Sequence, residues 1–473
     1  MDLRNKRVLV MGLGLHGGGL GVTRWLLKQG ARVTVTDLRT ENELKLTLAQ
    51  IDSKNVALVL GEHREADFAN ADLVIRNPGV PRDSRYLRIA RENKIPIRME
   101  LGLFTERLPR GMEQVIGITG TKGKTTTTLM TGAILKRANP KTVIAGNLRV
   151  SALELLDQID AATPVVLEMS SFQLEEFEDL KRSPHLAALT NVYPDHLNRY
   201  RDMDEYTWAK AQIFLHQQPR DFLILNFDNS ICTRLRPKAL AQVIWFSRAR
   251  ALKEGARVER DWLAWNEAGK VERLLPVAAL PMGQHNIENA LAALALAHAW
   301  GVPHSLIAEA LREFRGAPHR LELVRELDGV RYINDTTATA PHATIAALQT
   351  LASRGGKIFL IAGGADKGLP YDGLAKVILE TNAQVILLAG SATEKIERAL
   401  IARDARAQIA ARAQDLAQAL GAGKALARAG DVVLLSPGAA SFGMFANEFE
   451  RGDIFSRVSV GVIKRRIAEM GDA

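Results

Sequence analysis

The chain has 473 residues, which corresponds to two to four domains at roughly 100–200 residues each. Its 62 Lys and Arg outnumber 53 Asp and Glu, but the basic residues are scattered, which favours small anionic substrates over nucleic acid. The only cysteine, Cys232, excludes an internal disulfide and is typical of a reducing compartment, and no apolar run approaches the roughly 20 residues of a membrane helix.

Strand-like and helix-like runs alternate along the whole sequence, which predicts an α/β protein with mostly parallel sheets. A Pro/Gly break at "LPRGMEQ" ends the first block, and "FRGAPHR" ends the second. We therefore expect three domains, at residues 1–110, 111–318 and 319–473.

The first glycine-rich loop contains Gly12-x-Gly14-x-x-Gly17 between a strand and a helix, and the next strand ends at Asp37. Such glycines let the backbone approach a pyrophosphate at a helix N-terminus. The alternative is an ordinary tight turn, so the pattern indicates a nucleotide-like ligand and only weakly NAD. The start of the chain is better explained as this strand than as a signal peptide, because glycines interrupt its apolar run at once. "NPGV", beginning at Asn77, follows another strand and predicts a second loop on the same edge.

A second glycine-rich loop lies in "GITGTKGKTTTTLM", residues 117–130. Five residues separate Gly117 from Gly123, one more than in the common Walker pattern. The backbone amides can still form an anion nest, Lys124 can reach terminal phosphates, and Thr125 can coordinate Mg²⁺. A basic surface turn is the weaker alternative, because strand, loop and helix signals coincide here.

Polar residues follow the next strand-like runs. Glu168 ends "PVVLE", and Asp195 and His196 follow "LAALTNVYP". An edge glutamate and a structural Asp-His pair are the alternatives, but ligands of open α/β sheets gather at the carboxyl ends of strands. Lys210 falls in a helical pattern typical of a surface lysine. His285, Asn286 and Asn289 open an apolar helix, where Asn286 is either a helix cap or, with Asn289 on the same face, part of a base-binding site.

These motifs together resemble the Mur ligases of bacterial cell-wall synthesis. The resemblance rests on Gly-Thr-Lys-Gly-Lys-Thr-Thr at 120–126 and, most specifically, on "EMSSFQLE". "NVYPDHLNRY", "GQHNIENALAA", "APHRLE", "YINDTTAT", "LIAGGADKG" and "LLSPGAASFGMF" follow in the family's order. The match covers nearly the whole chain and is weakest in the N-terminal domain.

The resemblance implies an α/β fold with a Rossmann-like N-terminal domain, a P-loop-type ATPase central domain and a Rossmann-like C-terminal domain. It also implies a cytoplasmic monomer that acts on a uridine nucleotide, UDP-N-acetylmuramoyl-L-alanine, and on glutamate, without nucleic-acid or membrane partners. The uridine nucleotide would contact Gly14, Asp37, Arg39 and Asn77. The muramoyl-alanine end would contact Asn147, Ser170, Gln173 and Asn191, and glutamate would contact Thr339, Lys367, Ser441 and Phe442.

The activity implied is ATP-dependent addition of D-glutamate through an acyl phosphate. The ATP contacts implied by the resemblance are Gly120, Thr121, Lys122, Gly123, Lys124, Thr125, Thr126, Asn289, Arg320 and Asp335. Catalysis would depend on Lys124, Glu168, His196 and Lys210. Two Mg²⁺ ions are implied, with Thr125 and Glu168 holding one and His196 the second, next to a carbamylated Lys210.

The chain departs from the family pattern at two places. Thr336-Thr337-Ala338-Thr339-Ala340 replaces Ser-Lys-Ala-Thr-Asn, and Gly443 replaces an aspartate in "Phe-Asp-Met-Phe". Both departures lie where the amino acid is selected, so an L-glutamate-adding relative stays open. A folate-polyglutamylating ligase is the nearest other enzyme. A P-loop motor would need paired acids that "VVLEMSS" lacks, and an NAD dehydrogenase leaves the 117–126 loop unexplained.

Overall fold

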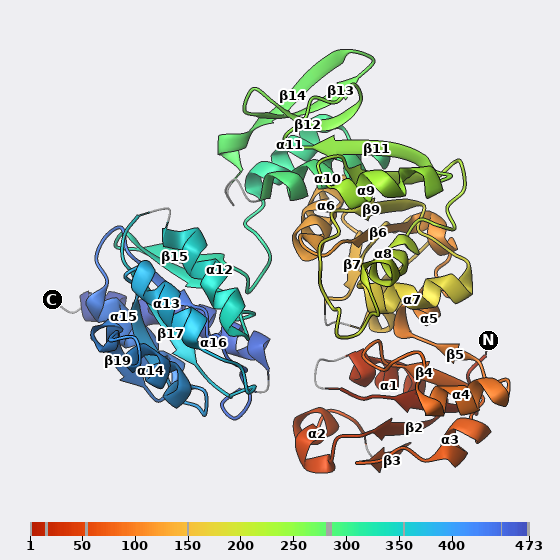
Figure 1. Cartoon of the computed structure of the whole chain (residues 1–473), viewed down its shortest axis with the longest axis horizontal. Helices are drawn as coiled ribbons and strands as arrows, with labels where there is room; N and C mark the ends of the chain where they lie inside the picture. Colours follow the sequence, from red (N-terminus) through yellow and green to blue (C-terminus); the bar gives the residue numbers. More distant parts are fainter. Residues whose placement is uncertain are drawn as a thin grey trace. The chain divides into compact units, whose positions relative to one another are not determined.

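The computed structural model describes residues 2–14, 18–52, 55–148, 151–280, 286–352, 355–445 and 447–470. The chain forms two compact units, Met1–Phe314 and Arg315–Ala473. The first unit contains two β-sheets and the second contains one (Figure 1). The expected α/β architecture with mostly parallel strands is confirmed, and each sheet is described below by itself.

The N-terminal sheet is entirely parallel, with strand order β3-β2-β1-β4-β5. Its strands are β1 (Arg7–Met11), β2 (Arg32–Asp37), β3 (Val56–Leu60), β4 (Leu73–Arg76) and β5 (Ile97–Arg98). Its helices are α1 (Gly18–Lys28), α2 (Glu41–Leu48), α3 (Glu65–Asn70), α4 (Arg85–Glu92) and, leading onward, α5 (Glu100–Thr105). Val8 and Val10 pack into the same core as Leu26 of α1, whereas Leu9 packs with Phe68 of α3, so helices cover both faces. Strand order reverses between β1 and β4, the place where such sheets bind ligands.

The second sheet has nine strands in the order β14-β13-β12-β11-β10-β9-β6-β8-β7. Its strands are β6 (Val115–Thr119), β7 (Val143–Gly146), β8 (Val165–Glu168), β9 (Leu186–Leu189), β10 (Phe222–Asn226), β11 (Gln242–Ser247), β12 (Gly255–Glu259), β13 (Trp262–Glu267) and β14 (Lys270–Pro276). Its α-helices are α6 (Lys124–Ala138), α7 (Ser171–Leu180), α8 (Met203–Ala211), α9 (Ser230–Leu235), α10 (Ile287–Ala299) and α11 (His304–Glu313). β9 contributes Leu186 and Ala188 to the core under α10, and Ala187 and Leu189 to the core of the other face.

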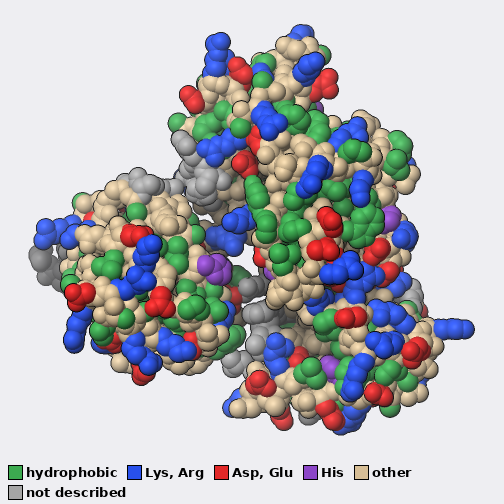
Figure 2. Space-filling model, viewed as in Figure 1, with side chains coloured by type: hydrophobic (Ala, Val, Ile, Leu, Met, Phe, Trp, Pro, Cys, Tyr) green, Lys and Arg blue, Asp and Glu red, His purple; other side chains and the backbone are tan. Residues whose placement is uncertain are grey.

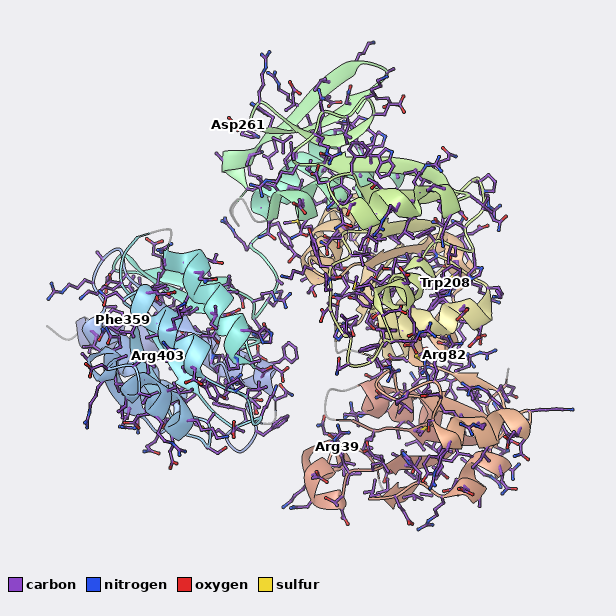
Figure 3. The ribbon with its side chains drawn as sticks, in the orientation of Figure 1. Arg39, Arg82, Trp208, Asp261, Phe359 and Arg403 are labelled. Atoms are coloured by element: carbon purple, nitrogen blue, oxygen red, sulfur yellow. The ribbon has the colours of Figure 1, made fainter. Side chains whose placement is uncertain are left out.

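An antiparallel extension of this sheet was not expected from the sequence. β12, β13 and β14 pair antiparallel, with the turn between β12 and β13 at Arg260 and Asp261, both in the left-handed region (Figure 3). The turn between β13 and β14 uses Gly269 at φ 80°. Short turns of this kind connect strands without the helix that a parallel crossover requires.

The second unit has a six-stranded sheet in the order β15-β16-β20-β17-β18-β19, in which only β15 and β16 pair antiparallel. Its strands are β15 (Glu322–Leu327), β16 (Val330–Asn334), β17 (Ile358–Gly363), β18 (Gln384–Leu388), β19 (Ile409–Ala413) and β20 (Val432–Leu435). Its α-helices are α12 (Pro341–Ala352), α13 (Asp372–Glu380), α14 (Thr393–Ile401), α15 (Leu416–Leu426) and α16 (Glu448–Met470). Leu360 and Ile361 of β17 point into separate cores, so this sheet is also covered on both faces.

Among the described residues, no helix is long and apolar enough to cross a membrane. Lys and Arg side chains are interspersed with Asp and Glu over the face shown in Figure 2. On this face the basic side chains are scattered, as the sequence indicates.

Candidate active site

The second glycine-rich loop joins β6 to α6 and lies at the carboxyl edge of the nine-stranded sheet. β6 is flanked by β8 and β9, so Glu168 at the end of β8 and Asn191 beyond β9 lie on either side of the loop. Gly117 is not part of the loop: it lies inside β6, where a Cβ would come within 2.5 Å of Pro184. The loop therefore begins at Gly120, which accounts for the spacing that departs from the Walker pattern.

Two loop positions require glycine. Gly120 adopts φ 153°, and a Cβ there would lie 2.0 Å from Thr190 Oγ1. Gly123 adopts φ 83° at the N-cap of α6, and its Cβ would lie 2.2 Å from Asn289 Oδ1. The backbone at the N-terminus of α6 thus stays free of side-chain bulk, as a phosphate-binding loop requires.

Replacing Gly123 with alanine is expected to weaken ATP binding at least about tenfold, because the added methyl meets Asn289 and forces the loop to move. Gly111→Ala is the matched control: Gly111 also has a positive φ, 56°, but a Cβ there meets nothing within 4 Å. Both variants carry a similar backbone cost of about 1–2 kcal/mol. Calorimetric titration with ATP measures the difference, and equal affinity in the two variants contradicts the steric argument.

Asn191 fixes the loop conformation. Its Oδ1 accepts a hydrogen bond from Lys122 N at 2.9 Å, its Nδ2 donates to Lys122 O at 3.1 Å, and its carbonyl accepts from Thr121 N at 2.9 Å. Thr190 Oγ1 adds a bond to Lys122 O at 2.7 Å. Asn191 therefore holds the loop in place, and the contact with the muramoyl-alanine end that the resemblance implies stays a prediction.

Two lysines converge on the carbonyl of Gly120. Lys124 Nζ donates to it at 3.0 Å, and Lys210 Nζ from α8 donates to it at 2.8 Å. Lys210 is only 2% exposed, so the surface-lysine interpretation of its helical pattern is wrong. Burial holds the pKa of the Lys210 amine well below its usual range, and the charge of Lys124 lowers it further.

Glu168 is a buried carboxylate with one unused oxygen. Its Oε1 accepts a hydrogen bond from Asn147 Nδ2 at 3.0 Å. Among the described residues, none donates a hydrogen bond to its Oε2, although the residue is only 2% exposed. A buried, unpaired carboxylate oxygen is unfavourable unless a cation or donor joins it, so this position fits a hard divalent cation.

The remaining predicted metal ligands lie near the same loop. Thr125 is in the first turn of α6 and is half-buried. His196 adopts φ 55°, and its half-exposed ring lies 5.0 Å from that of Phe172 and 6.1 Å from that of Tyr206. Within the described ranges there is no group of three or more His, Cys, Asp or Glu side chains that could hold a metal ion. Any metal site here therefore needs further oxygen ligands, such as phosphate or a modified lysine.

Tyr206 is a site residue that the sequence analysis missed. Its hydroxyl lies 3.2 Å from Thr121 Oγ1, and Lys210 Nζ lies 4.7 Å from its ring centre. The available signal was its spacing, since Tyr206 precedes Lys210 by one helical turn and shares its face.

The amides at the start of α10 reach the loop from another direction. Asn289 Nδ2 donates to Asn286 Oδ1 at 2.8 Å, which confirms that the two share a face, and Asn289 Oδ1 accepts from Thr127 Oγ1 at 3.3 Å. Asn286 occupies the N-cap position, but its side chain makes no capping hydrogen bond. The neighbouring His285, named in the sequence analysis, lies outside the described residues.

Ser170 and Gln173 hydrogen-bond to each other at the start of α7. Ser170 is the N-cap of α7; its hydroxyl accepts from Gln173 N at 3.3 Å, and Gln173 Oε1 accepts from Ser170 N at 3.0 Å. This reciprocal capping box stabilises the helix that follows Glu168.

The N-terminal residues predicted to hold the uridine nucleotide lie at or just beyond the carboxyl ends of three neighbouring strands, β2, β1 and β4. Asp37 accepts from Gly14 N at 3.1 Å and from Arg39 N at 2.9 Å, and the Arg39 side chain extends just before α2 (Figure 3). Asn77 Nδ2 donates to Gly12 O at 3.3 Å, and a Cβ on Gly12 would come within 2.9 Å of Asn77. Gly17, the third glycine of the pattern, lies outside the described residues.

Within the second unit, Lys367 Nζ donates to Thr339 Oγ1 at 3.1 Å. Ser441 is buried, its Oγ has no hydrogen-bond partner among the described residues, and Phe442 beside it is exposed. Asp335 accepts from Ser436 Oγ at 2.7 Å, and burial raises its pKa to about 6. Arg320 is exposed.

The two departures from the family pattern have distinct surroundings. Thr337, in place of lysine, bonds through its hydroxyl to His319 O at 2.9 Å. Gly443, in place of aspartate, adopts φ 91° with open space around it.

The sequence analysis also missed Arg451, which is fully buried and donates to Thr336 Oγ1 and Thr336 O, both at 2.9 Å.

Comparisons with known proteins agree along the chain. Family models match residues 6–99 (Mur ligase MurD-like, N-terminal domain), 118–297 (Mur ligase middle domain) and 319–438 (Mur ligase, glutamate ligase domain). A UDP-N-acetylmuramoylalanine–D-glutamate ligase of Roseiflexus sp. (strain RS-1) is 48% identical, covering 97% of this chain and 99% of that protein. An enzyme of the same name from Koribacter versatilis (strain Ellin345) is 38% identical over 97% and 98%.

Solved structures share the fold at lower identity. UDP-N-acetylmuramate-alanine ligase MurC from Thermotoga maritima matches 97% of this chain and 100% of that one, with 20% identity and a TM-score of 0.59. E. coli FolC in complex with DHPP and ADP matches 78% and 93%, with 18% identity and a TM-score of 0.53.

Proposed function

The chain belongs to the Mur ligase family, and we propose that it joins D-glutamate to UDP-N-acetylmuramoyl-L-alanine while ATP is converted to ADP and phosphate. The supporting likeness is to two proteins named D-glutamate ligases, at 48% and 38% identity over nearly the full length. The geometric observation that carries the proposal is a phosphate-type loop with two lysines on the Gly120 carbonyl, next to the buried Glu168 carboxylate, whose Oε2 has no hydrogen-bond partner in the described part of the chain.

The proposed chemistry activates a carboxylate before the amide forms. An oxygen of the alanyl carboxylate attacks the γ-phosphorus of ATP, the bond from that phosphorus to the bridging oxygen breaks, and ADP leaves. The glutamate amine attacks the acyl carbon of the acyl phosphate, inorganic phosphate leaves, and the amine releases its proton to solvent. The protein contributes positioning and charge neutralisation.

In this proposal the backbone amides of Gly120, Thr121, Lys122 and Gly123 bind the phosphates. Thr126, in the first turn of α6, contributes to the same site. Lys124 reaches the β- and γ-phosphates once it leaves the Gly120 carbonyl. Asn289 and Arg320 contact the adenine and phosphates, and Asp335 contacts the ribose.

Mg²⁺, when bound, supplies positive charge between the γ-phosphate and the incoming carboxylate, which would otherwise repel each other. Thr125 and Glu168 would hold one ion, and His196 the second. Lys210 takes part if its amine is carbamylated, because a carbamate attracts a cation that an ammonium repels.

The substrate contacts follow the three expected domains. Gly14, Asp37, Arg39 and Asn77 bind the uridine nucleotide, and Asn147 binds the muramoyl-alanine end. Ser170, Gln173 and Asn191 position the same end, and Ser170 and Gln173 also cap the start of α7. Thr339, Lys367, Ser441 and Phe442 bind glutamate, where an ammonium and hydroxyls suit a diacid. A cytoplasmic monomer with domains at 1–110, 111–318 and 319–473 completes the proposal.

Release of ADP tests the substrate assignment. The protein is incubated with ATP, Mg²⁺ and UDP-N-acetylmuramoyl-L-alanine, with D-glutamate or L-glutamate in separate reactions. Release with D-glutamate alone is the expected result, and it makes Thr337 and Gly443 tolerated substitutions. Release with L-glutamate alone moves the activity to the L-adding relative. A parallel reaction with a folate substrate distinguishes a FolC-like ligase, whose fold the chain shares.

A further inference from the structure

The loop that carries His196 is bound to the loop that follows β4. Arg199 Nη1 donates to Gly79 O at 3.1 Å, and its Nη2 donates to Val80 O at 3.1 Å. The Arg199 side chain is 17% exposed; its bond to Val80 O is partly buried, and its bond to Gly79 O lies at the surface. The planar guanidinium matches two carbonyls at once, a geometry that a single ammonium cannot reproduce.

Arg199 and His196 belong to one closed turn. His196 O accepts from Arg199 N at 2.9 Å and from Tyr200 N at 3.0 Å, and His196 itself is held at φ 55°. The Arg199 guanidinium lies 5.2 Å from the centre of the Phe172 ring, and that ring lies 5.0 Å from the ring of His196. The Phe172 ring therefore lies beside both the Arg199 guanidinium and the His196 ring.

The buried carboxylate of Glu175 stabilises the contact of Arg199 with Gly79 and Val80. Glu175 of α7 lies 3.1 Å from Arg76 Nη2 and 3.6 Å from Arg199 Nη2, and it accepts from the Tyr200 hydroxyl at 3.2 Å. Arg76, at the end of β4, also donates to Val80 O at 2.9 Å. Arg76 and Arg199 thus both donate to the Val80 carbonyl, and both lie close to the Glu175 carboxylate. Removing one member of such a buried group leaves its partners uncompensated.

These contacts continue to the residues predicted to bind the uridine nucleotide, Gly12–Gly14, Asp37 and Asn77, which are called the nucleotide cradle below. Asn77, which bonds to Gly12 O, begins the turn that presents Gly79 and Val80 to Arg199. Asn77 Oδ1 accepts from Gly79 N at 3.0 Å, and Asn77 O accepts from Val80 N at 2.9 Å. The turn is therefore hydrogen-bonded throughout, and it connects the Gly12–Gly14 loop to Arg199 without a break.

We propose that Arg199 is a positioning residue that sets the His196 turn against the nucleotide cradle, so that one substrate bound at both ends is held at the correct spacing. This inference rests on the proposed function, in which the uridine diphosphate occupies the cradle and the alanyl carboxylate reacts near His196. Binding energy gained at the remote uridine end is then used to orient the carboxylate, which raises kcat rather than affinity.

The test compares Arg199→Gln and Arg199→Lys with a matched control, Arg82→Gln. Arg82 also pairs with α7, through Glu178 at 2.7 Å and Asp179 at 3.1 Å, but among the described residues its side chain makes no hydrogen bond or ion pair with the 196–200 turn. Trp208 Nε1 contacts the same Glu178 from α8 (Figure 3). The measurements are kcat at saturating substrates and the Kd values of UDP and of ATP, each of which occupies one end only.

We expect kcat to fall about tenfold to a hundredfold in Arg199→Gln, with both Kd values within about twofold of wild type. Arg199→Lys keeps the charge but loses the two-carbonyl geometry, so most of the loss remains. Arg82→Gln keeps kcat within about twofold. An unchanged kcat in Arg199→Gln overturns the inference, as does an equal loss in Arg82→Gln or a general loss of UDP and ATP binding. Wild-type protein without turnover instead refutes the proposed function, so the two failures are distinguishable.

Discussion

Replacing Lys210 with alanine is expected to lower kcat by about two to four orders of magnitude. Lys210 is nearly inaccessible, bonds to the Gly120 carbonyl at 2.8 Å, and has a pKa held well below that of a free lysine by burial. A lowered pKa leaves more of the amine neutral near pH 7, and the neutral amine is the form that combines with CO₂ to give a carbamate and a proton. Higher pH therefore favours the modification.

Two further variants separate the carbamate from a simple positive charge. Lys210→Arg keeps the charge and cannot form the carbamate, so it should be as inactive as Lys210→Ala. Short carboxylates added to Lys210→Ala should restore part of the activity by occupying the vacated position. A carbamate signal in a ¹³C spectrum recorded with labelled bicarbonate, absent from Lys210→Ala, checks the modification directly.

Lys238 provides the control for these variants. It is exposed on the surface and lies 5.1 Å above the Trp208 ring, so Lys238→Ala should retain wild-type kcat. Full activity of Lys210→Ala, or of Lys210→Arg, would contradict the carbamate proposal. A matched loss in Lys238→Ala would show that the assay reports general damage.

Glu168→Gln is expected to reduce kcat by about two to three orders of magnitude with little effect on stability. Glu168 Oε1 is bonded to Asn147, but the buried Oε2 has no donor among the described residues. Removing a charge that the fold leaves unpaired should change the free energy of unfolding by no more than about 1 kcal/mol. The Mg²⁺ concentration needed for half-maximal activity should rise, because a carboxylate ligand has become an amide.

Asp221→Asn is the matched substitution with the opposite expected result. Asp221 is also buried, but both of its oxygens are used: Oδ1 lies 2.7 Å from His185 Nδ1, and Oδ2 accepts from Gln218 N at 2.6 Å. Its replacement should lower the free energy of unfolding by about 1.5–3 kcal/mol while kcat is retained. Urea unfolding and Mg²⁺ titration of both variants check the contrast. Glu168→Gln with wild-type kcat and an unchanged Mg²⁺ requirement would exclude Glu168 as a metal ligand.

The local features of this protein can be predicted from the order of its amino acids. Alternating strand and helix patterns predicted α/β domains with mostly parallel sheets, because period-2 and period-3.6 hydrophobicity follow directly from backbone geometry. The phosphate-type loop was visible because Gly120 and Gly123 occupy backbone conformations that side chains disfavour. Gly12, Gly14 and Asp37 were recognisable from their spacing, which reflects one strand, one turn and the next strand.

The antiparallel β12–β14 extension was decided by turns rather than by hydrophobic pattern. The direction of its strands depends on the left-handed residues Arg260 and Asp261 and on Gly269, which close the two turns. The role of Gly117 was also hidden, because the neighbour that excludes a side chain there, Pro184, is distant in sequence.

The pairing and burial of charged residues depend on how distant segments of the chain pack together. Lys210 has the local pattern of a surface lysine, and its burial against Gly120, some 90 positions earlier, depends on how α8 packs over the loop. The free oxygen of Glu168 and the sharing of Glu175 between Arg76 and Arg199 likewise depend on which strands and helices become neighbours. Sequence patterns record the conformation of each segment, whereas the environment of a charge is set by segments far along the chain, and this environment fixes its pKa and its partners.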